Sequence, residues 1–328
     1  MIVYNAQMSF FSHPSRRAFT LVELLVVLPL FALLTCGLAR ITVDFVELHS
    51  RLSDEAAARA RANRVRSVLG GPIAHCAYGM PGDGAAYRNV FPQSRDMVNS
   101  FYTWPAPISA ASSAVAFKER KNGACRIVYA IPSRLLTTKA ALVSGDRFTV
   151  ELTGKPTALD PVYPALKPNH TKNWAVFGSA TPQTGPFWLA AFGGANTVIL
   201  RRAAAGGVLK QGIIPQNDEL YYLRATEAKV SIYRGSDWAL YTNNQDGSGR
   251  QPRVEGVVDA RFAVSPSGRS VKVWLLVRGD RRGKVKTAIP AEWPAEFAND
   301  IPDEARLFNL YAFELTLGLR NYDAPLRD

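Results

Sequence analysis

The N-terminal apolar segment is the feature that most constrains what this chain can fold into. Residues Phe19–Leu38 read FTLVELLVVLPLFALLTCGL and contain a single charged residue, Glu23. A helix of this length spans about 30 Å, which matches the hydrocarbon thickness of a bilayer. Arg16 and Arg17 come directly before it, and such a basic flank stays on the cytoplasmic side. The sequence therefore predicts one membrane-spanning helix with the rest of the chain across the inner membrane.

The helix is predicted to continue beyond the membrane as far as a strong stop signal. Gly70-Gly71-Pro72 combines two glycines with a proline, so we expect the helix to end at Leu69. This divides the chain into four parts, namely residues 1–18 before the helix, a transmembrane helix over 19–39, an amphipathic continuation over 40–69 and a head over 70–328. One apolar face of the continuation should pack on the head, and it consists of Ile41, Phe45, Leu48, Leu52 and Ala56.

The head is predicted to consist of strands and turns, which gives an α+β fold with a long helix on an antiparallel sheet. Short apolar runs are separated by Gly, Pro, Asn and Asp, and the last third shows clear alternation. The boundaries within 72–121 are not determined by the pattern. The expected strands are Arg126–Ile131, Arg147–Leu152, Phe187–Phe192, Thr197–Arg201, Glu219–Arg224, Lys229–Arg234, Trp238–Thr242, Val258–Val264, Val271–Arg278 and Tyr311–Leu319.

Composition and motifs do not indicate an enzyme. The formal net charge of +12 is spread along the chain, and the densest basic cluster, Arg278–Lys286, is broken by Asp280 and two glycines. We interpret that cluster as a basic loop, with nucleic-acid or anionic-surface binding as the alternative. Nucleophile-elbow, zinc-protease and phosphate-loop motifs are missing. The sequence predicts no catalytic residue, no metal site and no cofactor.

The residues around Glu23 form a recognisable pattern. The run Arg16-Arg17-Ala18-Phe19-Thr20-Leu21-Val22-Glu23-Leu24 resembles the prepilin motif of the type IV pilin family, in which a basic leader ends in Gly, cleavage precedes Phe, and Glu is fifth in the mature chain. Here Ala18 stands in the place of that Gly. The resemblance implies that residues 1–18 are a leader, and that a prepilin peptidase cuts between Ala18 and Phe19 and methylates the amine of Phe19.

The resemblance also implies a role for Glu23 and a set of partners. In the family, this carboxylate meets the N-terminal amine of a neighbouring subunit and sets the register between helices. A buried carboxylate favours a positive partner, which gives that role a physical basis. The implied partners are other major and minor pilins, contacted through the helix, and the assembly platform of the inner membrane. The chain would wait in that membrane, with its head in the periplasm, and then enter a pilus at the cell surface.

The C-terminal third narrows the resemblance. Three segments follow one another in an order similar to that of PilW-type minor pilins. They are Val254–Phe262, which contains Glu255-Gly256-Val257, then Val271–Arg278, and finally Leu315–Asn321. This implies a subunit of the initiation or tip complex. Two alternatives stay open. One is a J-type minor pseudopilin of type II secretion, and the other is a membrane-anchored periplasmic enzyme or a lipoprotein processed at Cys36.

Two cysteines lie in the predicted head. Cys76 and Cys125 belong to no CxxC motif, and the histidines near them are too few for a zinc site. Disulfides persist in the periplasm, so we expect a bond between Cys76 and Cys125 that is worth about 4 kcal/mol.

Overall fold

The computed structural model describes residues 21–79, 104, 106–112, 123–155, 174–179, 186–202, 212–233, 237–244, 249–265 and 269–319. The chain divides into two compact units, residues 1–53 and 54–328. One helix, α1 (Leu21–Ala74), runs through the first unit and supplies the first segment of the second. All strands belong to the second unit, so the predicted α+β class with an antiparallel sheet-rich head is confirmed.

Helix α1 does not end where the stop signal predicted. It continues through Gly70, Gly71 and Pro72 to Ala74, and the amide of His75 still donates to the carbonyl of Gly71 at 3.1 Å. Pro72 lacks the amide that would bond to Val68, and glycine also disfavours a helix. Burial outweighs this local cost, because Leu69 and Ile73 on the last two turns are completely buried. The predicted end at Leu69 was therefore wrong by five residues.

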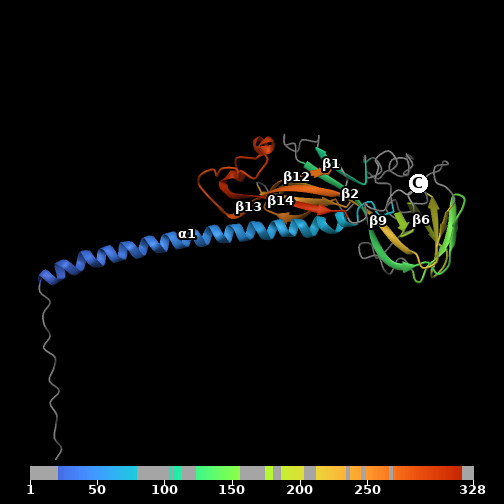
Figure 1. The fold of residues 1–328 in the computed structure, drawn as a ribbon, viewed down its shortest axis with the longest axis horizontal. Helices are drawn as coiled ribbons and strands as arrows, with labels where there is room; N and C mark the ends of the chain where they lie inside the picture. The colour runs from blue at the N-terminus through green and yellow to red at the C-terminus, as the bar shows by residue number, and fades with distance from the viewer. Residues whose placement is uncertain are drawn as a thin grey trace, which may run out of the picture. The chain divides into compact units, whose positions relative to one another are not determined.

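Within the described part of the chain, the larger sheet has nine strands, all paired antiparallel (Figure 1). Its central strand, β9 (Glu219–Tyr233), pairs with β2 (Gly123–Leu136) along one edge and with both β5 (Trp174–Phe177) and β10 (Asp237–Asn243) along the other. The sheet is completed by β1 (Ile108–Ser112), β4 (Arg147–Glu151), β6 (Phe187–Phe192), β7 (Thr197–Arg202) and β11 (Arg250–Glu255). A separate ribbon pairs β3 (Ala141–Val143) with β8 (Gly212–Ile214).

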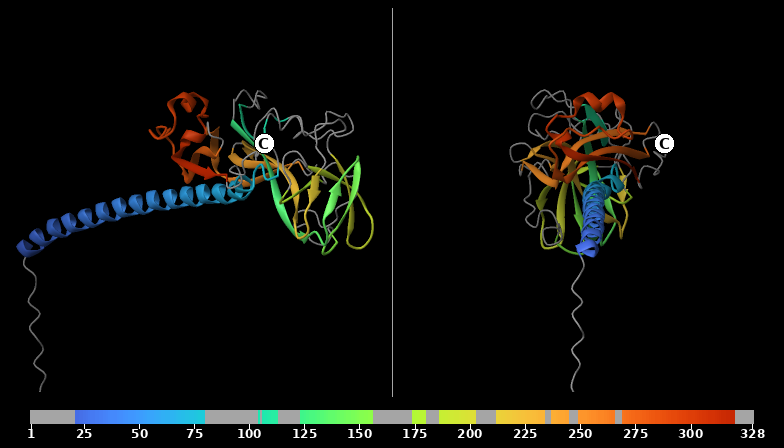
Figure 2. Two further views of the ribbon diagram at one scale, coloured as in Figure 1. Left: turned by 45° about the vertical axis from the view of Figure 1, so that its right-hand side comes forward. Right: turned by 90° about the vertical axis from the view of Figure 1, so that its left-hand side faces the viewer.

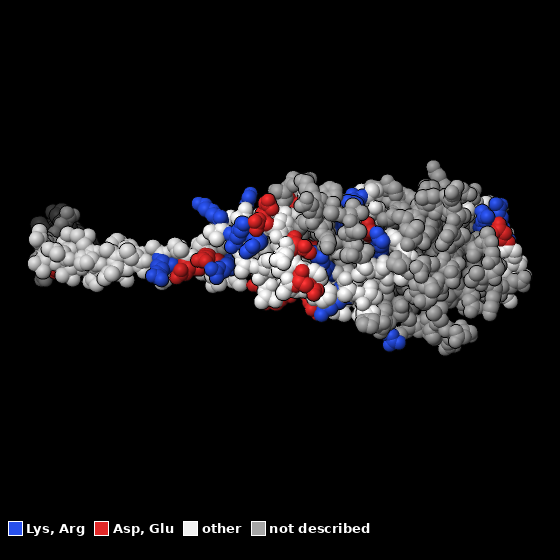
Figure 3. Space-filling view, turned by 90° about the horizontal axis from the view of Figure 1, so that it is seen from above, with Lys and Arg blue, Asp and Glu red and all other residues white. Residues whose placement is uncertain are grey.

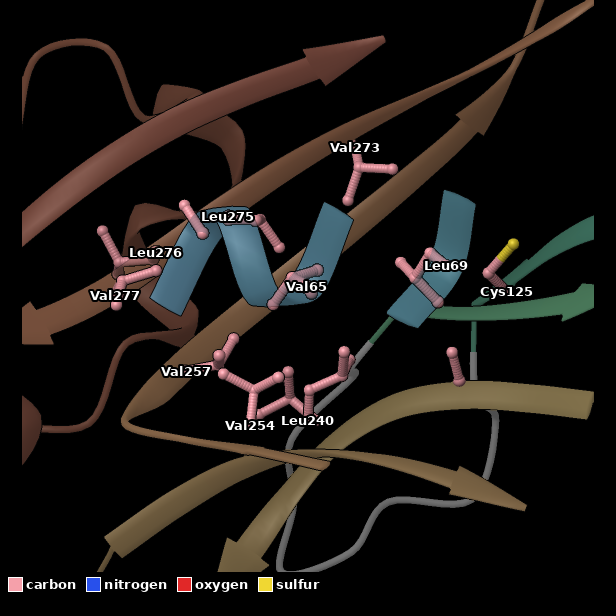
Figure 4. Close-up of a cluster of buried hydrophobic side chains, with 14 of the residues drawn as sticks. Val65, Leu69, Cys125, Leu240, Val254, Val257, Val273, Leu275, Leu276 and Val277 are labelled. Atoms are coloured by element: carbon pink, nitrogen blue, oxygen red, sulfur yellow. The ribbon is translucent and has the colours of Figure 1, made fainter. Parts of the chain in front are cut away.

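A second, three-stranded sheet carries the last part of α1. It has the order β12 (Val257–Val264), β13 (Ser270–Arg282) and β14 (Phe308–Gly318), and two short 3-10 helices, Ala295–Asp300 and Ala305–Leu307, lie between β13 and β14. Two turned views of the head show this sheet next to the last turns of α1 (Figure 2). Side chains of α1 and of both sheets form one core (Figure 4), and the members from α1 are Ala58, Ala62, Val65, Leu69 and Ile73.

The predicted strands match the structure best where an apolar run is continuous or alternates clearly. Phe187–Phe192 is reproduced to the residue, and β12, β13 and β14 fall on the three predicted C-terminal strands. Glu219–Arg224 and Lys229–Arg234 were predicted as two strands but form one, β9, because no turn-forming residue interrupts Ala225–Ala228. Strands β1, β3, β5, β8 and β11 were not predicted, and each has six residues or fewer.

Candidate functional site

The first part of α1 exposes an unusually apolar surface. Every large apolar side chain from Leu21 to Leu52 is between 51 and 81% exposed. An 18-residue stretch of the helix has a mean hydropathy of 2.4, and none of it is buried. Figure 3 shows this stretch as a nearly uncharged cylinder on the face in view. Because the burial of each such side chain is worth roughly 1.5–3 kcal/mol, this surface is suited to lipid or to neighbouring helices.

The residues of the prepilin-like motif are only partly described. Arg16, Arg17, Ala18 and Phe19 lie outside the described residues. Glu23 lies in the first described turn of α1 and is exposed, as the acidic residue of an otherwise apolar turn. A carboxylate at this end of a helix interacts favourably with the helix dipole.

The face of α1 that packs on the head is not the predicted one. Ile41, Phe45, Leu48, Leu52 and Ala56 are exposed. The buried face carries smaller side chains and one acid, and consists of Asp54, Ala58, Ala62, Val65, Leu69 and Ile73. Alanines let the helix approach the sheet closely, and the apolar pattern alone did not reveal this.

Asp54 is the polar centre of that buried face. It is 2% exposed, and its Oδ1 accepts hydrogen bonds from the amides of Asp280 (3.1 Å) and Arg281 (3.3 Å). Its Oδ2 accepts a third bond from Nδ2 of Asn309 at 2.9 Å. A Cβ on Gly279 would lie 2.9 Å from Cγ of Asp54, so only glycine fits there. These contacts fix α1 to the irregular end of β13.

Arg61 makes a second contact between α1 and the same region. Its Nη1 donates to the carbonyl of Arg278 at 2.8 Å, and its Nη2 binds the carboxylate of Asp280. Gly256, between β11 and β12, has a φ of +77°, and a Cβ there would lie 2.8 Å from Nε of Arg61. Gly256 is therefore required both by its conformation and by the arginine beside it. We call Asp54, Arg61, Gly256, Arg278, Gly279, Asp280 and Asn309 the helix clamp.

Arg278 joins the helix clamp to the larger sheet. Its guanidinium binds Asp237 of β10 in a bidentate pair, with Nε–Oδ1 at 3.0 Å and Nη2–Oδ2 at 2.7 Å, and it lies 4.5 Å from the ring centre of Phe308. Burial alone would raise the pKa of Asp237, but hydrogen bonds from Arg278 and from the amide of Trp238 hold it below its usual range. Gly256 and Arg278, which belong to two of the three C-terminal sequence patterns, thus meet at Arg61.

The basic cluster Arg278–Lys286 contains several ion pairs. Arg278 pairs with Asp237, Lys286 with Asp303 at 2.7 Å, and the Asp280 within the cluster with Arg61. The positive charge available to a nucleic acid is therefore smaller than the sequence indicates.

Cys76 and Cys125 are buried in one core but do not form a bond in the structure, where both are free thiols. Cys76 forms an isolated bridge with Tyr129, and Cys125 lies four residues earlier on β2. The two thiol groups are near enough to interact electrostatically, but they are not bonded. The Sγ of Cys76 instead contacts the carbonyl of Pro107 at 3.6 Å.

We expect both thiols to be unreactive in the folded protein. Burial raises the pKa of Cys125 to about 12 and also raises the pKa of Cys76, so at pH 8 the thiolate fraction is roughly a thousandfold below that of an exposed cysteine. In a reduced Cys36→Ser variant, iodoacetamide should label neither thiol until guanidinium is added, and then label both. Keeping these thiols protonated in the core contributes to the free energy of unfolding. That contribution is fully present below pH 9, the pKa of an unfolded cysteine, and is lost as the pH rises towards 12. A denatured, unreduced protein that cannot be labelled would show a disulfide instead.

Within the described part of the chain, no group of three or more His, Cys, Asp or Glu side chains could hold a metal ion. A scan against protein-family models found no match, and a search of curated proteins found none either. The described residues thus give a single membrane-compatible helix and a β-rich head that binds the helix through a polar clamp.

Proposed function

We propose that this protein is a minor pilin-like subunit that acts by assembly rather than by catalysis. Its apolar helix holds it in the inner membrane until a prepilin peptidase removes residues 1–18, and the same helix then packs among the helices of other subunits in a type IV pilus. One observation supports this most directly, namely that α1 exposes an apolar surface from Leu21 to Leu52. This is more than the roughly 20 residues that cross a bilayer.

The length of that surface favours assembly over simple anchorage. The apolar residues Ile41, Phe45 and Leu48 follow the charged Arg40, beyond the stretch that a membrane would cover. A membrane anchor has no need for them, whereas a bundle of neighbouring helices would bury them. We place the subunit in the initiation or tip complex, because a head of more than 250 residues would crowd a repeating filament.

The mature N-terminus tests this proposal. In protein purified from its native membrane, we expect the chain to begin at Phe19 with one added methyl group, because the peptidase cuts before Phe19 and methylates its amine. Intact-mass and N-terminal peptide mass spectrometry measure both changes.

A Cys36→Ser variant is the matched control. It should be processed like the wild type, whereas a lipoprotein would begin at an acylated Cys36 and would lose its processing in this variant. A native chain that starts at Met1, or anywhere other than Phe19, would refute the proposal.

A further inference from the structure

The segment at the end of β13 carries a short run of exposed cations. Arg281–Lys286 reads RRGKVK, and all six residues are exposed. The run contains four cations and no acid. Its charge is only partly neutralised, because Lys286 pairs with Asp303 at 2.7 Å whereas Arg282 and Lys284 make no ion pair with any described residue. We call Arg281–Lys286 the basic tip.

The basic tip also exposes one apolar side chain. Val285 is 79% exposed, the highest value for a large apolar side chain in the described part of residues 54–328. It stands between Lys284 and Lys286, at a bend of the chain. A single exposed apolar side chain is ordinary at a protein surface, so its meaning depends on what surrounds it. Here it is surrounded in the sequence by cations.

Hydrogen bonds hold the chain on both sides of this bend. The amide of Gly283 donates to the carbonyl of Leu307 at 2.6 Å, and the amide of Thr287 donates to the carbonyl of Arg306 at 2.6 Å. The hydroxyl of Thr287 also donates to the carbonyl of Phe308 at 2.7 Å. The three residues between Gly283 and Thr287 are therefore exposed on a turn with fixed ends, and binding through them would need little further ordering of the backbone.

Acidic side chains also occur later in the segment between β13 and β14. They are Glu292, Glu296, Asp300, Asp303 and Glu304. Two of them are engaged within the chain, since Asp300 binds Arg261 and Asp303 binds both Lys286 and Arg306. The excess of cations is therefore local to the basic tip, and it acts over about 10 Å at 0.1 M salt. A negatively charged partner must touch the tip itself.

We propose that the basic tip binds the surface of a membrane that contains anionic phospholipids. Lys and Arg side chains are attracted to phosphate-bearing headgroups, and an apolar side chain among them enters the boundary with the acyl chains. Nucleic acid would use the cations alone, because phosphate contacts dominate its binding and leave Val285 in water. The combination of cations with Val285 therefore favours lipid.

The test uses the full chain in nanodiscs of neutral phosphatidylcholine, which keep it in solution without detergent. Sucrose-loaded vesicles are added, and co-sedimentation measures how much of the chain they bind. One set of vesicles contains equal parts of phosphatidylcholine and phosphatidylglycerol, and the other contains phosphatidylcholine alone. We expect at least about tenfold tighter binding to the anionic vesicles, and weaker binding as salt is raised.

Variants of the chain assign the site. Val285→Ser keeps every charge and should weaken binding about tenfold, because it removes the apolar side chain that enters the membrane. Replacing both Arg282 and Lys284 with Ser should weaken binding about thirtyfold. The matched control replaces Arg147 and Arg250, exposed cations on β4 and β11, with Ser. It makes the same change in net charge and should bind normally.

This result is separate from the assembly proposal, since Glu23→Ala should bind the vesicles like the wild type. Equal binding to both kinds of vesicle, normal binding by Val285→Ser, or an equal loss in the Arg147 and Arg250 control would each overturn the proposal. A DNA duplex that displaces the vesicles, and whose binding is lost in the Arg282 and Lys284 variant but not in Val285→Ser, would assign the tip to nucleic acid and also overturn it.

Discussion

Replacing Glu23 with Ala should leave membrane insertion and processing intact while filament incorporation falls at least tenfold. The substitution removes the one charge from the apolar segment, so insertion becomes easier rather than harder. In the proposed assembly, the carboxylate neutralises the new amine of a neighbouring Phe19 between packed helices. Breaking a buried ion pair costs about 3–5 kcal/mol, and 1.4 kcal/mol corresponds to a factor of ten. Immunoblots of sheared filaments and of membranes measure the two pools.

Glu47→Ala is the control for this experiment. Glu47 lies on the same helix but outside the apolar segment, and it pairs with Arg51 one turn later in an exposed ion pair. Such pairs contribute at most about 1 kcal/mol, so incorporation should be nearly normal. Glu23→Asp, which keeps the charge, should recover part of the incorporation. Normal incorporation of Glu23→Ala would refute the pairing role of this carboxylate.

Replacing Asp54 with Ala should destabilise the head by about 3 kcal/mol. The substitution leaves the amides of Asp280 and Arg281 without their acceptor at a buried site, and hydrogen bonds to a charged group are worth about 1.5–3 kcal/mol. For a unit of this size the midpoint of thermal unfolding should fall by roughly 6–12 °C. Circular dichroism of the detergent-solubilised full chain at the wavelength of β-structure measures this.

Glu55→Ala is the matched control, one residue away on the same helix. Glu55 pairs with Arg59 at the surface, and its loss should change the midpoint by less than about 2 °C. Asp54→Asn keeps one acceptor oxygen and should lie between wild type and Asp54→Ala. If Asp54→Ala unfolds like the control, the helix clamp does not stabilise the attachment of α1.

The extent to which the fold was predictable differs between its parts. The strands of the three-stranded sheet follow local periodicity, because each of them meets the core on a fixed face, and the apolar segment and β6 follow from continuous apolar runs. The end of α1 could not be predicted in this way, because the burial of Leu69 and Ile73 stabilises the last turns of the helix and the local sequence does not show that burial. Short strands such as β5 and β8 have too few residues to display a period.

Of the candidate site, the apolar segment with Glu23 was predictable from the sequence, whereas the helix clamp was not. Glu23 stands out because a single acid in an apolar run is rare, and a sequence can show that directly. Asp54, by contrast, is one of several acids on an amphipathic helix, and its burial depends on Gly279 and Asn309 more than 200 residues away. An acid flanked by alanines at helical spacing, together with the pair Gly256 and Gly279, was the available signal.

The sequence by itself determined that one long apolar helix precedes a β-rich head, because hydropathy and alternation are local properties that water and lipid act on directly. Tertiary structure alone decided which face of α1 is buried, that Arg61 meets Gly256 and Arg278, and that Cys76 and Cys125 are buried in one core as free thiols. These outcomes depend on the register between strands and on contacts between distant segments. A one-residue slip in register would move the side chains of a strand to the other face of the sheet without any change in the local sequence pattern.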